Sequence, residues 1–197
     1  MTSSPSTSLR DVARNAVRDE VMRAAWELFA VHGFEATTVE QIAEAAGMSR
    51  RTFFRYFNGK DELILDKLLE VGDRVAAALA ARPPKEAAWP ALRAALDVVV
   101  LAQDQAPEPS RRLGQLLRDE PSTRGSMEER RRRWTDALGP LVAERLPGHG
   151  EAAGRAVAGA ALACYDAATD AWIDAPGTAF ARHLDTAMDA LAHAALA

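Results

Sequence analysis

The chain has 197 residues, of which 48% are hydrophobic and 26% are charged, and its formal net charge is −4. This composition is typical of a folded globular protein and excludes both a disordered chain and a generally basic nucleic-acid coat. The longest apolar run, residues 156–165, is well short of the ~20 residues that span a bilayer, so no membrane partner is expected.

The N-terminal part of the chain begins with a polar stretch rich in Ser and Thr. This stretch lacks the apolar core of a secretory signal, so it is not interpreted as one. We expect residues 1–14 to form a disordered arm. Helical periodicity then predicts a first helix over about 11–32, which Gly33 ends. Its buried stripe is expected to contain Val17, Val21, Ala25 and Leu28.

Two short helices are predicted next. Thr37 with Glu40, and Thr38 with Gln41, both have the spacing of a capping box, so a second helix is predicted over 38–45. Gly47 supplies a turn, and Ser49 can then cap a third helix over 50–57. Two short helices joined in this way predict a helix-turn-helix.

The third predicted helix has two different faces at about 100° per residue. The aromatic face is expected to pack on the first two helices and contains Phe53, Phe54 and Phe57. The opposite face carries groups that can hydrogen-bond to base edges or phosphates, namely Arg51, Thr52, Arg55 and Tyr56. Such a division is what a helix in the major groove requires.

Positive charge is concentrated in the same region. Residues 1–60 carry a net charge of +1 and the remainder −5, and four positive charges with no acid lie between Met48 and Lys60. A local basic patch on an acidic body predicts phosphate binding at one place only.

The whole string from Gly33 to Leu63, including GFEATTV, IAEAAGMS and TFFRYF, closely resembles the N-terminal signature of the TetR family of transcriptional regulators. The resemblance is ungapped over about residues 15–65. It implies a three-helix DNA-binding domain at 15–60 and a connecting helix at 61–82. It also implies a larger helical domain at 83–197 for ligand binding and dimerisation.

Carried over residue by residue, the family pattern implies base reading by Arg50, Arg51, Thr52 and Arg55. It implies phosphate contacts from Thr38, Ser49, Tyr56 and Lys60. We expect Arg51 or Arg55 to prefer guanine, because one guanidinium can bond to O6 and N7 together.

One position departs from the pattern. Phe54 stands where many family members have a Tyr whose hydroxyl reaches a phosphate, so that contact is expected to be missing here. Arg55 is a candidate for electrostatic compensation.

The resemblance also implies partners. They are a double-stranded DNA operator with pseudo-palindromic half-sites, a second copy of the chain in a homodimer, and a small-molecule effector, apolar or aromatic in character. The predicted function is a ligand-responsive transcriptional regulator, most often a repressor, that the effector releases from DNA. The alternative is an all-helical small-molecule-binding or scaffold protein without sequence-specific DNA binding.

The rest of the chain keeps helical periodicity without sustained strand-like alternation, so the fold class is all-α. Asn58 can cap a fourth helix that runs to about Ala81, where Pro83 and Pro84 stop it. Further helices are expected over 88–104, 108–119, 123–145, 150–174 and 178–195.

Two sites are expected in this C-terminal half. The last two helices are predicted to form the dimer seam through Ala156, Ala160, Ala163, Ala167, Leu184, Met188 and Leu191. An effector pocket is predicted between helices and would be lined by Leu96, Val100, Leu113, Leu117, Trp134, Leu138 and Tyr165. For both sets the alternative is ordinary packing in the core of one chain.

Residues 128–133 read Glu-Glu-Arg-Arg-Arg-Arg. Because Glu128 with Arg132, and Glu129 with Arg133, lie at i,i+4, we interpret the run as a solvated face that pairs with itself. Trp172 is interpreted as a packing anchor.

Nothing in the sequence predicts catalysis. The four histidines and the single Cys164 lack metal-ligand spacing, and a phosphate-binding glycine loop or a Ser-His-Asp constellation is not evident. One cysteine allows no intrachain disulfide, which suits a reducing cytoplasm. The sequence therefore predicts no enzyme activity, no metal and no cofactor.

Overall fold

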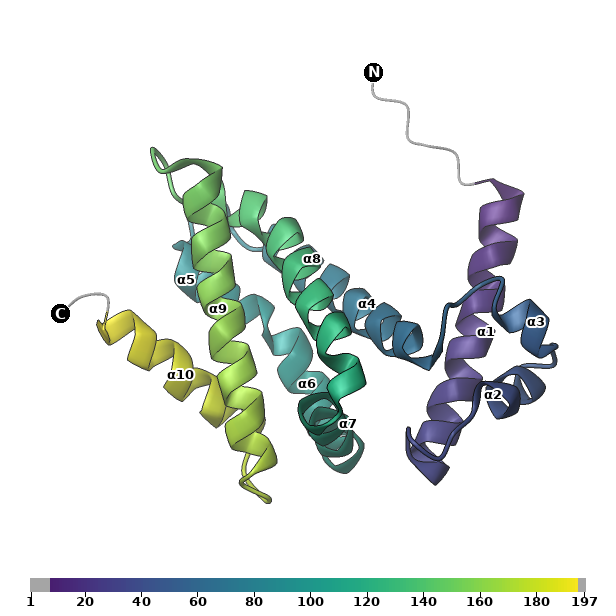
Figure 1. The fold of residues 1–197 in the computed structure, drawn as a ribbon. Helices are drawn as coiled ribbons and strands as arrows, with labels where there is room; N and C mark the ends of the chain where they lie inside the picture. The colour runs from purple at the N-terminus through teal and green to yellow at the C-terminus, as the bar shows by residue number, and fades with distance from the viewer. Residues whose placement is uncertain (1–7, 195–197) are drawn as a thin grey trace. The chain divides into compact units, whose positions relative to one another are not determined.

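The computed structural model describes residues 8–194 and is helical throughout this part of the chain, with no strand (Figure 1). The long N-terminal helix α1 (Leu9–His32) is followed by α2 (Val39–Ala45), α3 (Arg50–Phe53) and α4 (Lys60–Ala80). The remaining elements are α5 (Ala88–Ala95), α6 (Asp97–Gln105), α7 (Pro107–Asp119), a 3-10 turn η1 (Pro121–Thr123), α8 (Arg124–Ala143), α9 (Gly150–Ile173) and α10 (Phe180–Ala194). The all-α prediction is confirmed.

The chain divides into two compact units, and the boundary between Ile64 and Leu65 falls inside α4. The predicted connecting helix at 61–82 corresponds to α4. Its N-terminal part belongs to the first unit and the rest belongs to the second. Leu63 belongs to the core of the first unit, and Val75 and Leu79 belong to the core of the second.

The predicted disordered arm is wrong for residues 9–14, because α1 already begins at Leu9. The segment from Leu9 onward contains residues that a helix tolerates well and neither Gly nor Pro, so the helix extends back to the end of the Ser- and Thr-rich stretch. Residues 1–7 lie outside the described part of the chain.

Side chains from four helices form the core of the first unit. Its buried members are Val21, Ala25, Ile42, Ala43, Phe53, Phe57 and Leu63. Val21 and Ala25 are one helical turn apart on α1, which places both on the stripe that faces α2 and α3. Val17 and Leu28, predicted for the same stripe, are half-buried.

Local hydrogen bonds define where α2 and α3 start. Thr38 N donates to Gln41 Oε1 at 2.8 Å, and Gln41 N donates to Thr38 Oγ1 at 3.2 Å, which completes the second of the two possible capping boxes. Thr52 N donates to Ser49 Oγ at 3.1 Å, so Ser49 is the N-cap of α3 as predicted.

The third helix is shorter than predicted. It ends at Phe53 rather than Phe57, and the next residues form tight turns in which Arg55 N donates to Thr52 O and Tyr56 N donates to Phe53 O. These i to i+3 bonds wind the backbone more tightly than an α-helix does, and they redirect the chain toward α4.

In the second unit, α8 and α9 run side by side, and α10 packs along α9 (Figure 1). Glycines allow α8 and α9 to approach closely, because a Cβ on Gly154 would lie 2.3 Å from Gly139 O. The segment predicted as one helix over 88–104 is two helices, α5 and α6, with a break at Leu96. Neither Gly nor Pro marks that break. None of the described helices is both long enough and apolar enough to cross a membrane.

Candidate nucleic-acid interface

The recognition segment, residues 49–57, buries two of its three phenylalanines. Phe53 and Phe57 are 0% and 1% exposed, whereas Phe54 is 44% exposed. The prediction that Phe54 packs on the first two helices is therefore wrong. Phe53 and Phe57 lie at i,i+4 and define the buried stripe, and Phe54 lies to one side of it, outside the core of the first unit.

The arginines of this segment differ in how they are held. Arg50 Nε lies 2.9 Å from Glu40 Oε1 on α2, in an exposed ion pair. Arg55 extends over the Tyr56 ring, with its guanidinium carbon 5.2 Å from the ring centroid. Arg51 is exposed, and within residues 8–194 its guanidinium faces no partner. Among the described residues, Arg51 and Arg55 are therefore the arginines of this segment that form no ion pair, and Arg55 Nη2 lies 3.4 Å from the Tyr56 hydroxyl.

The hydroxyl groups predicted to contact DNA also support the local fold. Ser49 Oγ and Thr52 Oγ1 lie 2.9 Å apart, and Ser49 Oγ also accepts from Thr52 N. Thr38 Oγ1 belongs to the capping box of α2. All three side chains are exposed or half-exposed; Thr38 and Ser49 are the N-caps of α2 and α3, and the Thr52 hydroxyl lies against that of Ser49.

Lys60, predicted to bind phosphate, is held by the loop between α1 and α2. Its Nζ donates to Phe34 O at 2.7 Å and lies 3.4 Å from both Glu35 O and Thr37 O. The same nitrogen is 4.2 Å from the centroid of the Phe34 ring. An ammonium has three donors, so these carbonyl oxygens match its whole hydrogen-bonding capacity and give Lys60 a structural role.

Arg18 is a structural residue that the sequence reasoning missed. Its Nη1 donates to Tyr56 O at 2.5 Å, its guanidinium lies 4.3 Å from the Phe57 ring centroid, and its Nη2 is 3.4 Å from Glu62 Oε1. It thereby fastens the turn after α3 to α1. The only signal in the sequence is its position beside the buried stripe of the first helix.

The residues predicted for the dimer seam fall into two groups. Ala156, Ala163 and Ala167 are exposed on α9, Ala160 is half-buried, and Leu191 on α10 is exposed. Leu184 and Met188 are 0% and 2% exposed, so their assignment to the seam is wrong. They lie on the face of α10 that packs on α9 of the same chain, together with Phe180.

A groove of about 540 Å³ lies between α9 and α10. Its walls are mostly small side chains, and Ala167 is the one predicted seam residue among them. Arg182 and His183 also line it, and His183 Nε2 is 2.8 Å from Thr178 Oγ1.

Five of the residues predicted for the effector pocket lie in the packed core of the second unit: Leu96, Val100, Trp134, Leu138 and Tyr165. Trp134 stacks on Tyr165 with ring centroids 5.8 Å apart, and its Nε1 donates to Leu68 O at 3.0 Å. Burial raises the pKa of the Tyr165 hydroxyl. Leu113 and Leu117 on α7 are half-buried. The pocket itself stays a prediction.

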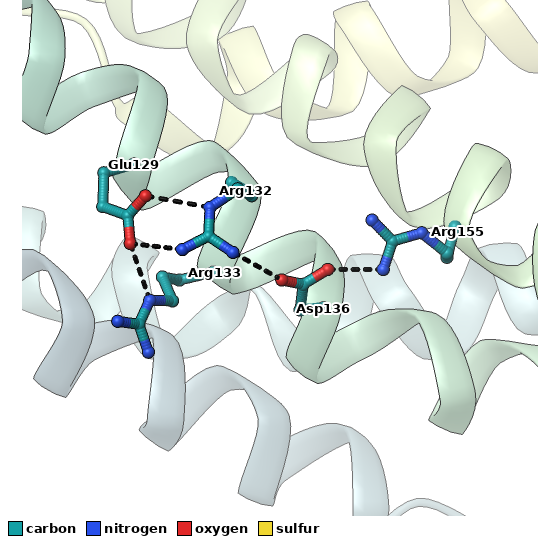
Figure 2. Close-up of polar contacts among 5 residues, drawn as sticks. All are labelled: Glu129, Arg132, Arg133, Asp136 and Arg155. Carbon is teal, nitrogen blue, oxygen red and sulfur yellow. Dashed lines mark hydrogen bonds and ion pairs between the residues drawn. The ribbon is translucent and has the colours of Figure 1, made fainter.

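Three residues of the run at 128–133 pair with one another, as Figure 2 shows: Glu129, Arg132 and Arg133. Arg131 pairs instead with Asp166 on α9. Glu129 Oε1 lies 2.7 Å from Arg133 Nε and 2.6 Å from Arg132 Nη2, and these two partners lower the pKa of Glu129 to about 2. Asp136 then joins Arg132 to Arg155 on α9. Arg132 thus pairs with Glu129 and Asp136, where we predicted Glu128.

Arg130 departs from the solvated-face interpretation. It is 4% exposed, its Nη2 lies 2.5 Å from Asp166 Oδ1, and its guanidinium is within 5.5 Å of the Trp134 and Tyr165 ring centroids. Helical periodicity places Arg130 one turn before Trp134, on the face of α8 that meets α9.

Trp172 is the packing anchor that we predicted. It is 2% exposed, its Nε1 donates to Thr178 O at 2.9 Å, and Arg111 of α7 lies 3.9 Å from its ring centroid. Among the described residues, no group of His, Cys, Asp or Glu is placed to hold a metal ion.

Two family models match the chain. Residues 21–66 match the model described as bacterial regulatory proteins, tetR family, and residues 86–195 match that of the MftR C-terminal domain. The first match contains α2, α3 and the recognition segment, and the second covers α5 to α10 completely.

Curated relatives are similar over part of their length. The regulator TcmR of Streptomyces glaucescens is 40% identical over 106 residues, which cover 50% of this chain and 47% of TcmR. The putative mycofactocin biosynthesis regulator MftR of Mycobacterium tuberculosis is 44% identical over 50 residues, 25% of each chain. The chain thus matches about half or less of the length of these relatives.

Solved structures extend the similarity to the whole fold. FadR of Thermus thermophilus, a repressor solved in complex with lauroyl-CoA, is 28% identical, with 89% of this chain and 93% of FadR covered and a TM-score of 0.60. SmeT, the repressor of a Stenotrophomonas maltophilia efflux pump, shares the fold at 17% identity and a TM-score of 0.64, with 92% of this chain and 91% of SmeT covered. From the recognition segment, the two family models and these relatives, we conclude that the chain belongs to the TetR family of transcriptional regulators.

Proposed function

We propose that this protein is a ligand-responsive transcriptional repressor that binds a pseudo-palindromic DNA operator as a homodimer and is released by a small apolar or aromatic effector. The observation that carries the proposal is the recognition segment itself. Phe53 and Phe57 fix it to the core of the first unit, while Arg51 and Arg55 remain exposed. Rigid support beneath exposed guanidiniums suits sequence reading in the major groove.

The roles of individual residues in DNA binding follow from this geometry. Arg51 and Arg55 are the candidates for base reading, with Arg50 and Thr52 beside them. Thr38, Ser49 and Tyr56 are the candidates for phosphate contacts: the first two are exposed N-caps, and Tyr56 is half-buried with its hydroxyl beside Arg55. Lys60 would attract the phosphate backbone by its positive charge, while its hydrogen bond to Phe34 O holds the ammonium in place.

The homodimer is proposed to form through α9 and α10. The exposed alanines of α9 would let a second copy approach closely, and Leu191 together with the groove between the two helices offers further apolar surface. A two-fold dimer is required to read two half-sites about 34–36 Å apart.

The effector is proposed to bind in the second unit, near the residues predicted for the pocket. The lauroyl-CoA complex of Thermus thermophilus FadR supports a ligand with a long apolar chain. α4 supplies residues to the cores of both units, so a shift in its position would reach the recognition segment. The effector releases DNA only to the extent that it binds the non-binding conformation more tightly.

Selection from random duplexes, followed by binding titrations over a salt series, tests the proposal. We expect one pseudo-palindromic sequence whose affinity falls steeply with salt, because neutralised phosphates release counterions. Arg51→Ala should weaken operator binding by about 5- to 150-fold and relax the preference at one guanine. Absence of any sequence preference at every salt concentration would favour the binding or scaffold alternative. Addition of lauroyl-CoA to the operator complex is the first test of effector class.

A further inference from the structure

Phe54 exposes an aromatic ring on the recognition segment. It is 44% exposed, although Phe53 and Phe57 in the same segment are fully buried. The other large hydrophobic side chains exposed within residues 8–194 are aliphatic: Val12, Val31, Leu101 and Leu191. No element of the first unit needs the Phe54 ring for its core, so its place on the surface calls for another explanation.

Two neighbours hold the ring in a defined orientation. The rings of Phe53 and Phe54 meet edge to face, with centroids 5.6 Å apart and an interplanar angle of 87°. The guanidinium carbon of Arg50 lies 5.4 Å from the Phe54 ring centroid. Because Phe53 is anchored in the core and Arg50 is paired with Glu40, both neighbours are themselves positioned. The ring is therefore presented with little freedom of orientation.

The surroundings of the ring are cationic. Arg50, Arg51 and Arg55 lie within four positions of Phe54, and no acidic residue occurs from Ala45 to Lys60. A basic surface attracts the phosphate backbone of DNA. Binding of the backbone would bring an apolar side chain on that surface, here Phe54, close to the base edges in a groove of the duplex. The charge thus favours duplex DNA over an apolar partner protein as the occupant of this surface.

A phenyl ring has no hydrogen-bonding atom, so it cannot reach a phosphate as a tyrosine hydroxyl does. In the major groove, thymine is distinguished by its C5-methyl group, which apolar side chains recognise. We propose that Phe54 is a specificity-determining residue that reads the C5-methyl group of a thymine in each operator half-site, beside the base that Arg51 or Arg55 reads. This inference rests on the proposed function, since it requires a specific operator.

Single replacements of thymine by uracil in the selected operator test the inference, because they remove only the methyl group. We expect one thymine per half-site at which uracil weakens wild-type binding roughly 4-fold, the effect of losing one buried methyl. Phe54→Ala should bind that operator more weakly than wild type and should no longer distinguish thymine from uracil there. Phe54→Leu, which keeps an apolar side chain, should retain part of the discrimination.

Two controls separate this role from a structural or phosphate role. Thermal unfolding should show Phe54→Ala to be as stable as wild type, since the ring is outside the core. The dependence of log affinity on log salt should be unchanged in Phe54→Ala, whereas loss of a phosphate contact lowers the slope by about 1.

Three results would overturn the inference. They are equal sensitivity of wild type and Phe54→Ala to uracil at every thymine, no thymine at which uracil matters, and an equal loss of affinity for operator and random duplex in Phe54→Ala. Each of these leaves the operator intact and the proposed function standing. Failure of the wild-type protein to select any operator instead removes both proposals.

Discussion

At the scale of single residues, Lys60 has a larger structural part than its family position implies. Its ammonium lies among three carbonyl oxygens of the loop between α1 and α2, 2.7 to 3.4 Å away. This loop carries Thr37 and leads into the N-cap Thr38, so Lys60 helps to place the start of α2. Arg18 plays a comparable part at the turn that follows α3. Two cations of the first unit thus hold the loop before α2 and the end of the recognition segment.

Lys60→Met should destabilise the protein, because the carbonyl oxygens lose a charged donor while the aliphatic stem is kept. We expect the free energy of unfolding to fall by about 1–3 kcal/mol. Urea denaturation followed by circular dichroism measures this change. Lys67→Met is the matched control, since within residues 8–194 Lys67 pairs only with Glu70, in an exposed i,i+3 ion pair, and should change stability little. Unchanged stability of Lys60→Met, with a salt slope lowered by about 1, would instead make Lys60 a simple phosphate contact.

At the scale of elements, the packing of α8 against α9 combines a close backbone approach with surface ion pairs. Gly139 and Gly154 face each other, and a Cβ on Gly154 would meet Gly139 O and Ala143 N at 2.3 and 2.7 Å. The chain of ion pairs from Glu129 through Asp136 to Arg155 then links the two helices at their surface (Figure 2). The glycines set the distance between the helices. The ion pairs add a salt-dependent contribution to the stability of this packing.

Gly154→Ala should be destabilising, because backbone atoms cannot give way to the added methyl group. A loss of about 1–3 kcal/mol in the free energy of unfolding is expected. Gly159→Ala on the same helix has open space around the new Cβ and should be neutral or stabilising by up to about 1 kcal/mol. Chemical denaturation of both variants gives the comparison, and a similar loss in the two would mean that the glycines matter through something other than packing of α8 on α9.

The ion-pair chain should make a contribution to stability that depends on acid pH. The folded-state pKa of Glu129 is about 2, below its ordinary value of 4.5, because Arg132 and Arg133 favour the carboxylate. A lowered pKa stabilises the fold above the unfolded-state value, and this contribution is lost as the pH falls from about 4.5 toward 2.

Glu129→Gln should therefore unfold at a lower temperature than wild type at pH 6. The difference should shrink below pH 4.5 and vanish near pH 2. Calorimetry over this pH range, at low salt, measures it. Glu128→Gln serves as the control, because Glu128 is exposed and, among the described residues, the ion-pair partners of Arg132 and Arg133 are Glu129 and Asp136. A difference in unfolding temperature that stays constant with pH would contradict a lowered pKa of Glu129.

At the scale of the whole molecule, the proposed function depends on how copies of the chain assemble. The exposed alanines of α9 and the groove beside α10 are the surface through which we propose that the homodimer forms. Leu184 and Met188 hold α10 against α9 within each chain, so α9 and α10 present one preformed surface.

Ala163→Arg should separate assembly from folding. Ala163 is exposed in the single chain, so the arginine is accommodated there, but its bulk and charge would oppose a second copy at the same face. We expect sedimentation to show monomers with an unchanged circular dichroism spectrum, together with operator affinity lowered at least 10-fold. Ala102→Arg, on exposed α6 surface, should leave the dimer intact. A dimer that tolerates Ala163→Arg would place the seam elsewhere.

The amino-acid sequence is enough to predict the features that depend on neighbouring residues. The capping box at Thr38, the N-cap at Ser49, the positions of most helices and the family signature are local patterns, and short-range hydrogen bonds and helical periodicity specify them. Local chemistry also indicated which side of the third helix carries its arginines.

Which surfaces are buried depends on packing between distant parts of the chain. Phe54 and Phe53 are the same residue type at adjacent positions, yet one is exposed and the other buried, because α1 and α2 cover only one side of α3. For the same reason Leu184 and Met188 are core residues rather than seam residues, and Arg130 is buried although it stands in a charged run. A pattern of hydrophobic spacing identifies an apolar face, but the segment that packs on it comes from elsewhere in the chain, and that pairing is a long-range property.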